Sequence, residues 1–394
     1  MGSASLDRRD FMMLAAGAAA APFFGPKAAF AADAGRPSLV VVILRGGLDG
    51  LAAIGPHGDP GYRRARTGLA IARPGEADGF SDLDGFFGLH PAMTHGHALY
   101  RRGELIPMIG VASPYRGRSH FDAQDMLENG TTETAGSTGW LNRAMPAIGS
   151  EGMRAISVGG LVPLLLRGDA PVASWMPAVA KAPDEAFLSL MDNLYATDGT
   201  LGPAWQESRA TDRMLDIPPP GRPDFEHVCA IAAQMMNAED GPRVVSLEVD
   251  GWDMHSSQGA ATGRLERLMG GLDRGLGRLA SDLTPERWKK TAILAVSEFG
   301  RTVQMNGTGG TDHGTGGAAF LLGGAVEGGR VLHDWRGLEE KDLHERRDLP
   351  PSIDLRAVFK GVLHDHMKID SRTLETEVFP DSGNAPATRD LLRA

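Results

Sequence analysis

The sequence predicts an α/β protein built on an open, mostly parallel sheet. Continuous apolar runs such as residues 38–44 and 292–296 lack polar alternation, which is typical of strands buried on both faces of a parallel sheet. Helical segments with one apolar face separate these runs, and the longest covers residues 262–283. Acids, histidines and glycines directly follow several of the runs, as expected at the carboxyl edge of such a sheet.

Length and charge narrow the class of protein. The chain has 394 residues and is 42% hydrophobic, enough for a large core, and single α/β domains of this size are common. A formal net charge of -10 leaves no basic stripe to follow phosphates, so we expect no nucleic-acid partner. Cys229 is the one cysteine of the sequence, so stability must come from packing, a bound metal or both.

The first 31 residues predict an export signal. Arg8 and Arg9 precede an Ala-rich apolar segment, residues 14–24, and a small-residue cleavage site follows at residues 29–31. This order resembles a twin-arginine signal, although Asp7 stands where a Ser or Thr is usual. The apolar segment is too short for a stable membrane span. We therefore expect the twin-arginine export machinery as a partner and a periplasmic or secreted mature chain.

Residues 32–394 are predicted to form a single domain with a helical insertion around residues 183–240. Further strands are expected at residues 104–111, 154–158, 162–166, 243–249 and 318–322, with a possible edge at 331–332. Further helices are expected from the cap Ser119 to about Glu128 and at residues 185–195, 203–215, 225–237 and 353–366.

The strand ends carry a set of potential metal ligands, and so does the loop before the strand at residues 318–322. The set is Asp49, Asp253, His255, Glu298, Asp312 and His313. Histidine and carboxylate ligands in a cysteine-poor exported chain suit a divalent cation, with zinc as the first candidate and calcium, magnesium or manganese as alternatives. Each motif is weak alone, and their joint occurrence at strand ends predicts a metal site.

Ser119 has two possible roles. As the predicted N-cap of a helix, with Asp122 three residues on, it would accept a backbone hydrogen bond, and capping alone explains its presence. The same position favours a nucleophile, because helix N–H groups stabilise an oxyanion. His120 and His90 adjoin these motifs, and each could line the cleft or make a structural hydrogen bond.

Five of these segments together resemble a known family. Residues 44–50, 119–124, 251–255, 297–301 and 312–314, with the arginine pair near the start, resemble a bacterial twin-arginine-exported domain family of unknown function that is related to alkaline phosphatases and sulfatases. The resemblance implies an alkaline-phosphatase-like three-layer α/β/α sandwich with metal-binding strand ends. It implies no particular substrate.

The resemblance also implies roles for individual residues. Asp49 corresponds to the first metal ligand, Asp253 and His255 to ligands of one cation, His313 to a late histidine and Ser119 to the nucleophile. Arg45, Arg301 or Arg118 would orient an anionic oxygen.

Two departures from the superfamily's pattern bear on the metal and the nucleophile. Glu298-Phe299 stands where Asp-His is common, so either a second metal lacks a ligand or Asp312-His313 is that pair. Cys229 lacks the Cys-x-Pro-x-Arg setting of formylglycine sulfatases. A formylglycine mechanism is therefore not expected.

The function implied is metal-dependent hydrolysis of phosphate or sulfate esters. The substrate would be an anionic ester, and a sugar-linked ester of an envelope or extracellular polysaccharide is one class that fits. The alternative is a catalytically weak or inactive relative that binds a glycan or a partner protein through the same cleft, supported by the missing ligand at Phe299. A metal-dependent isomerase or transferase of phosphorylated substrates is a third interpretation.

Overall fold

A computed structural model describes residues 36–148, 155–176, 185–199, 201–202, 205–206, 209, 224–239 and 241–393. The expected export signal lies outside the described residues, as does most of the helix expected at 203–215. Within the described part of the chain, no helix has both the length and the apolar character needed to cross a membrane.

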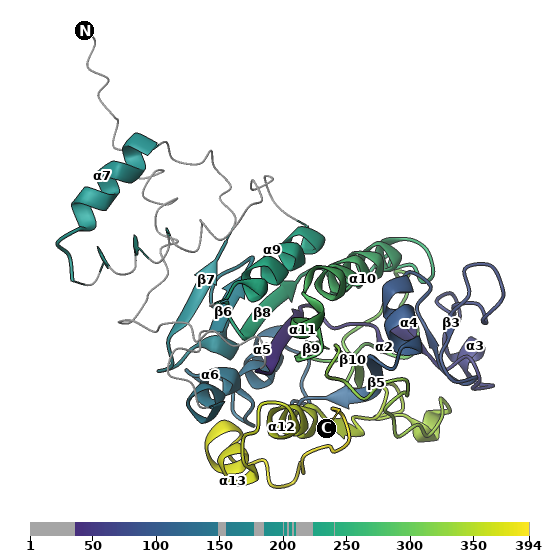
Figure 1. Ribbon diagram of the computed structural model, residues 1–394. Coiled ribbons are helices and arrows are strands. Elements are labelled where there is room, and N and C mark those ends of the chain that lie inside the picture. The colour runs from purple at the N-terminus through teal and green to yellow at the C-terminus, as the bar shows by residue number, and fades with distance from the viewer. Residues whose placement is uncertain are drawn as a thin grey trace.

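An eight-stranded sheet forms the centre of the molecule, in the order β11-β5-β10-β9-β1-β8-β6-β7 (Figure 1). Its strands are β1 (Ser38–Leu44), β5 (Leu105–Ala112), β6 (Ala155–Val158), β7 (Val172–Trp175), β8 (Val244–Val249), β9 (Thr291–Val296), β10 (Gly317–Leu322) and β11 (Ile353–Asp354). β1 pairs in parallel with β8 and β9, whereas β10 is antiparallel to β9 and β5. The sheet is therefore mostly parallel, as predicted.

Helices cover both faces of this sheet. Val40, Val42 and Leu44 of β1 belong to one apolar cluster, with side chains of α9 (Phe225–Asn237) and α10 (Arg264–Asp282). The alternate residues of β1 belong to a second cluster, with α6 (Trp140–Ala144) and α12 (Leu355–Asp365). Figure 1 shows these two helical layers above and below the sheet. The three-layer α/β/α arrangement is confirmed.

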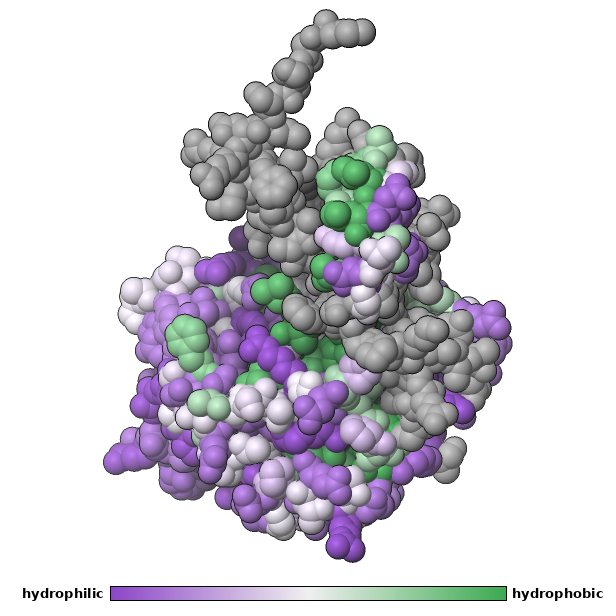
Figure 2. Space-filling view, turned by 90° about the vertical axis from the view of Figure 1, so that its left-hand side faces the viewer, coloured by the Kyte–Doolittle hydropathy of each residue, from purple (hydrophilic) through white to green (hydrophobic). Residues whose placement is uncertain are grey.

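The remaining elements are short or lie outside the layers. They are α2 (Gly50–Ala53), α3 (Tyr62–Ala65), α4 (Thr94–Arg101), α5 (His120–Asn129), α7 (Glu185–Tyr195), α11 (Pro285–Trp288), α13 (Ser371–Thr373) and a small sheet of β2 (Ile54–Gly55), β4 (Gly88–Leu89) and β3 (Ser81–Asp82). Figure 1 shows α7 apart from the sheet, and Figure 2 shows apolar side chains of this region at the surface. Leu190 and Leu194 on α7 are among the exposed apolar residues.

One predicted strand is wrong. Residues 162–166 contain a 3-10 turn, Leu164–Leu166, closed by hydrogen bonds from Leu166 and Arg167 N–H to the carbonyls of Pro163 and Leu164. Leu165 and Leu166 are buried, so the apolar run reflects burial of a turn. Residues 331–332 form only an isolated bridge, between Leu332 and Met108.

The topology brings five loops to one edge of the sheet. β1, β5, β8 and β9 run in the same direction, so the residues that follow them emerge together, and antiparallel β10 begins at this edge. The segments are residues 45–49, 113–119, 250–255, 297–301 and 311–316. All six predicted metal ligands lie in these loops.

Candidate metal centre

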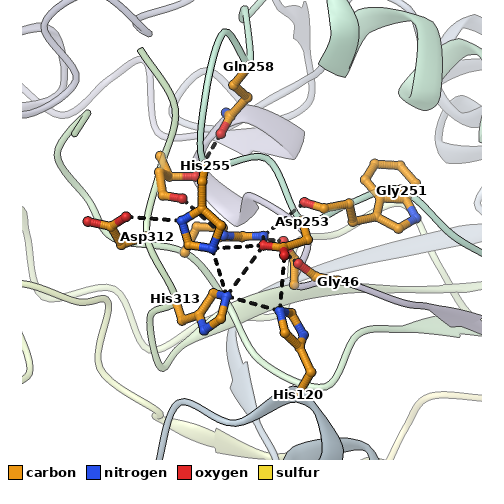
Figure 3. A network of polar contacts seen from close by, with 12 residues as sticks. Gly46, His120, Gly251, Asp253, His255, Gln258, Asp312 and His313 are labelled. Carbon is orange, nitrogen blue, oxygen red and sulfur yellow. Dashed lines mark hydrogen bonds and ion pairs between the residues drawn. The ribbon is translucent and has the colours of Figure 1, made fainter. Parts of the chain in front are cut away.

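Three imidazole rings and one carboxylate converge at this edge (Figure 3). The Nε2 atom of His313 lies 3.0 Å from Nε2 of His120 and 3.0 Å from Nε2 of His255. Asp253 Oδ1 lies 3.0 Å from His255 Nε2 and 3.4 Å from His313 Nε2, and Asp253 Oδ2 lies 3.5 Å from His120 Nε2. His120, Asp253 and His313 thus form a group whose potential ligand atoms lie within 4.8 Å of one another, and His255 adjoins this group through Asp253 and His313.

These separations fit ligands of a single cation. Two ligand atoms that each lie about 2.1 Å from a zinc ion are about 3.0 Å apart at a right angle and about 3.4 Å apart at the tetrahedral angle. The separations around His313 fall at these values. Because an imidazole nitrogen has one lone pair, His313 Nε2 can ligate only one ion, and His120, Asp253 and His313 together could hold it.

Each histidine is oriented by an acceptor behind it. His120 Nδ1 lies 2.8 Å from Glu298 Oε1, His255 Nδ1 lies 3.1 Å from Asp312 Oδ1, and His313 Nδ1 lies 2.8 Å from the carbonyl oxygen of Arg118. The carbonyl can only accept, and an ionised carboxylate can only accept, so each Nδ1 carries the proton. The Nε2 lone pairs then point at one another. A proton on one ring would satisfy one contact, whereas a cation satisfies all of them.

Arg301 holds Asp253 and three of the loops in place. Its guanidinium is buried and donates to Asp253 Oδ1 at 2.5 Å. The same group donates to the carbonyls of Gly47, Gly46, Trp252 and Thr311. Burial alone would raise the pKa of Asp253, but the hydrogen bond and charge of Arg301 lower it below its ordinary value. Asp253 is therefore held as a carboxylate.

A glycine permits the close approach of two strand ends. Gly46 has φ +121, and a Cβ atom there would lie 2.4 Å from the backbone nitrogen of Asp253. Any side chain at this position would separate the loop after β1 from the loop after β8. The tight contact sets the position of Asp253.

Glu298 stands behind His120 and is not in the group of converging donors. Its buried Oε1 accepts from Gly46 N–H at 2.8 Å, from Gln124 Nε2 at 3.1 Å and from His120 Nδ1. Burial would raise the pKa of Glu298, but these bonds, that of His120 first among them, lower it. The hydrogen bond that His120 donates to Glu298 in turn raises the pKa of His120. The predicted ligand is thus placed as the residue that orients a ligand.

The pKa values of the other groups follow from their surroundings. Burial lowers the pKa of His313, and the nearby charges of His120 and Arg301 act in the same direction. The hydrogen bond from Asn306 lowers the pKa of Asp312, and His255 adds to this effect. A neutral His313, with its Nε2 atom facing Asp253, is suited to ligate a metal.

Asp49 lies outside the cluster. Its Oδ2 atom accepts from Arg66 Nη2 at 2.5 Å and from Gln258 Nε2 at 2.6 Å, and its Oδ1 atom caps α2 through the N–H of Ala52. Both carboxylate oxygens are therefore occupied by buried donors. The prediction that Asp49 is a metal ligand is therefore wrong. Its carboxylate forms a buried ion pair with Arg66.

Two of the three arginines expected to orient an anionic oxygen, Arg45 and Arg301, have other partners. Arg45 Nη1 contacts Glu128 Oε1 at 2.9 Å and its Nη2 contacts Glu248 Oε1 at 2.5 Å. Burial opposes the charge, but the hydrogen bond to Glu248 and the two acidic groups raise the pKa of Arg45. Arg301 donates to the loop carbonyls and Asp253 as described above. Both guanidinium groups position the framework.

Ser119 is the N-cap of α5, as predicted. Its Oγ atom accepts from Asp122 N–H at 3.4 Å, but its own N–H donates to Tyr115 Oη at 2.9 Å. In a capping box the side chain of Asp122 would accept a hydrogen bond from the backbone N–H of Ser119, but here Tyr115 takes both places, since its Oη also donates to Asp122 Oδ2 at 3.4 Å. Ser119 lies between Arg118 and His120, two residues that contact His313.

His120, for which the sequence allows either a place in the cleft or a structural hydrogen bond, lies in the cluster. Its position directly after a helix cap and next to two arginines was the available signal, but nothing in the sequence places this helix at the strand ends. Phe299 packs on the same group, with its ring centroid 4.8 Å from that of His120 and 4.9 Å from that of His313. An apolar ring thus fills the place where a further ligand was sought.

Residues 181–378 match the family DUF1501, which is described as a protein of unknown function. Because the match covers half of the chain, the protein belongs to this family. No curated protein sequence matches the chain.

Several solved structures are similar to this chain at low identity. Murine ectonucleotide pyrophosphatase/phosphodiesterase 5 in complex with AMP has a TM-score of 0.31 and 10% identity over 68% of this chain, which spans 57% of the murine chain. The C-terminal periplasmic domain of EcEptC from Escherichia coli, in complex with Zn, has a TM-score of 0.33 and 11% identity over 76% of each chain.

A protein in the alkaline phosphatase superfamily from Vibrio parahaemolyticus has a TM-score of 0.27 and 11% identity, covering 91% of this chain and 75% of its own. Similarity of this degree does not establish a shared activity.

Proposed function

We propose that this protein is an exported, metal-dependent hydrolase of phosphate or sulfate esters. The observation that supports the proposal is the position of the Nε2 atoms of His120 and His255 and of the Asp253 carboxylate around His313 Nε2, while every Nδ1 atom donates to an acceptor behind it. Histidine with carboxylate is the donor set of catalytic zinc. A cation bound there would polarise an ester oxygen as a Lewis acid.

The residues of the chain would supply positioning and access. Asp253 and His255 are exposed on the solvent side of the cluster, so an ester could reach the donors. Ser119, next to His120 at the start of α5, is the proposed nucleophile. A formylglycine route is disfavoured because Cys229 is fully buried in α9 and burial raises its pKa well above the ordinary value.

Substrate and location are part of the same proposal. A sugar-linked anionic ester of an envelope or extracellular polysaccharide would suit an enzyme exported to the periplasm or beyond. The export proposal depends on the arginine pair at Arg8 and Arg9. Microscopy or fractionation of cells with Arg8→Lys/Arg9→Lys would test it, since a twin-arginine substrate would remain in the cytoplasm.

Metal binding is the first test. We expect the purified chain to bind about one divalent ion per molecule, and His255→Ala and His313→Ala to lose most of that affinity, measured by elemental analysis and by thermal stabilisation with added zinc, calcium, magnesium or manganese. His227→Ala is a matched control: its side chain is 51% exposed against 45% for His255, and its Nδ1 atom also contacts a carboxylate, Asp224. Full occupancy in both site variants would refute the assignment.

The second candidate function is that of a non-catalytic binding protein. The number of possible protein ligands at the site supports it. If His255 joined His120, Asp253 and His313 around the ion, four protein ligands would complete a tetrahedral zinc shell, which is typical of structural sites, whereas catalytic sites keep a position open. A metal-loaded chain that turns over neither aryl phosphates nor aryl sulfates, but binds a glycan or a partner protein, would favour this candidate. Turnover of either ester by the wild-type chain, lost in His313→Ala, would favour the hydrolase.

A further inference from the structure

We propose that Arg118 is the residue that binds the anionic group of the substrate, and that Glu345 competes with the substrate for this arginine. The inference rests on the proposed function and specifies how the same site recognises an anion. Its evidence comes from the arginines around the site, from the position of Arg118 and from the conformation of the loop that carries Glu345.

The other arginines of the site have little capacity left for a ligand. Arg301 is buried and donates to Asp253 and four carbonyl oxygens. Arg45 is paired with Glu128 and Glu248. Arg347 donates to the His313 carbonyl at 2.7 Å and to Asp348. An anionic ester would have to break several hydrogen bonds or ion pairs to recruit any of these three.

Arg118 is differently placed. Its carbonyl oxygen accepts from His313 Nδ1 at 2.8 Å, so its backbone lies directly against the cluster, and its neighbours in sequence are Ser119 and His120. Among the described residues, its guanidinium contacts one carboxylate, Glu345, at 2.6 Å. The side chains of this ion pair are 47% and 59% exposed. Exposed ion pairs contribute little to stability, so this one can be exchanged for another anion.

Glu345 is held in position by an unusual loop. Glu345 and Arg346 both have positive φ angles, +50 and +58, which non-glycine residues seldom adopt in succession. The loop is fixed to the site by Arg347, which donates to the His313 carbonyl, and by buried Asp348, which accepts from Thr315 Oγ1 at 3.0 Å. Arg118 therefore contacts the side chain of His313, and the loop that carries Glu345 contacts the backbone of His313.

The chemistry of the exchange favours a phosphate or sulfate group. A guanidinium can donate two parallel N–H bonds to two oxygens of such a group, as it can to a carboxylate. An ester whose one oxygen reaches the metal donors could place its other oxygens near Arg118. The carboxylate of Glu345 must then leave, so its negative charge weakens anion binding in the wild-type protein.

The test measures binding of inorganic phosphate and inorganic sulfate to the metal-loaded full chain by calorimetry, without any need for turnover. We expect Arg118→Gln to weaken binding by about tenfold or more, and Glu345→Gln to tighten it several-fold. Arg278→Gln is the matched control: Arg278 is 45% exposed and pairs with Asp282 at 2.7 Å near the end of α10, at the opposite edge of the sheet. It should bind both anions as the wild type does.

Metal content and melting temperature of each variant would show that folding and the cation are intact, as expected for exposed side chains. The proposal is overturned if metal-loaded Arg118→Gln binds phosphate and sulfate as tightly as the wild type, or if Glu345→Gln binds them no more tightly. Failure of the proposed hydrolase is a separate result, since it would appear as anion binding that depends on Arg118 without turnover of any ester.

Discussion

Glu298 is placed to tune the affinity for a cation that it would not contact. Its buried carboxylate accepts from His120 Nδ1 and raises the pKa of that ring, which makes Nε2 a stronger donor to a metal. We predict that Glu298→Gln, which keeps the shape but removes the charge, lowers metal affinity about 10- to 100-fold. Competition with a metal-sensitive chelator dye would measure this change.

The chain contains a matched control for this prediction. Asp273 is also a buried carboxylate and lies 2.9 Å from His95 Nδ1, but the pair is not part of the metal cluster. Asp273→Asn should lower stability while leaving metal affinity unchanged. If Glu298→Gln bound metal as tightly as Asp273→Asn, Glu298 would be a structural acid only.

Residues of the site could be predicted only where the adjacent sequence indicates that they lie at the end of a strand. Asp253, His255, Asp312 and His313 follow or precede apolar runs, and the structure places all four at or beside the cluster. Asp49 has the same local setting, but its partner Arg66 is not recognisable in the sequence as buried. His120 required knowledge of where its helix lies.

At the scale of elements, α5 joins the site to the fold through its first residues. Ser119 caps the helix and His120, the first helical residue, contacts His313. The hydrogen bond from Asp122 N–H to Ser119 Oγ is long, at 3.4 Å. Ser119 can therefore be both a modest cap and a nucleophile, and two substitutions separate these roles.

We predict that Ser119→Ala lowers the free energy of unfolding by about 0.5–1 kcal/mol, whereas Ser119→Asn preserves it, because asparagine is an equally good N-cap. Both variants should lose most ester turnover, since neither side chain carries the hydroxyl. Urea unfolding and initial rates on aryl phosphate and aryl sulfate would be measured in parallel. Wild-type rates in Ser119→Asn would exclude Ser119 as the nucleophile.

The apolar runs predicted most strands because a strand buried on both faces has few alternatives in sequence. Their direction was less accessible: β10 has the same apolar pattern as β9, yet it runs antiparallel to it. The 3-10 turn at Leu164–Leu166 has a similar composition to a strand, and only its i to i+3 hydrogen bonds distinguish it. The direction of a strand, and whether an apolar run forms a strand at all, depend on the strands with which it pairs. Those strands are distant in sequence.

At the scale of the whole molecule, the two edges of the sheet differ in the residues that they carry. The carboxyl edge carries the cluster of polar donors, whereas the opposite edge is closed by contacts between the layers. His366, the C-cap of α12, makes one such contact. Its Nε2 atom lies 2.9 Å from the carbonyl oxygen of Ser38 at the start of β1. The contact joins a helical layer to the central strand.

This histidine gives the fold a pH dependence that is independent of the metal. Burial lowers the pKa of His366 from 6.5 to about 4, although its hydrogen bond to Ser38 acts in the opposite direction. The unfolded chain therefore binds this proton more readily than the folded chain does. Titration of His366 leaves the free energy of unfolding unchanged above about pH 6.5. As the pH drops from there to about 4, this one group lowers the free energy of unfolding by about 3 kcal/mol in total.

We predict that His366→Gln, which can still donate to Ser38, has a shallower loss of stability between about pH 6.5 and 4 than the wild type. The comparison requires metal-free protein, because protonation of the cluster histidines would release a bound cation over a similar range and add its own loss of stability. Urea unfolding of both chains in chelator at several pH values measures the difference. Parallel curves would mean that the folded and unfolded chains bind this proton equally well, so that burial does not shift the pKa of His366.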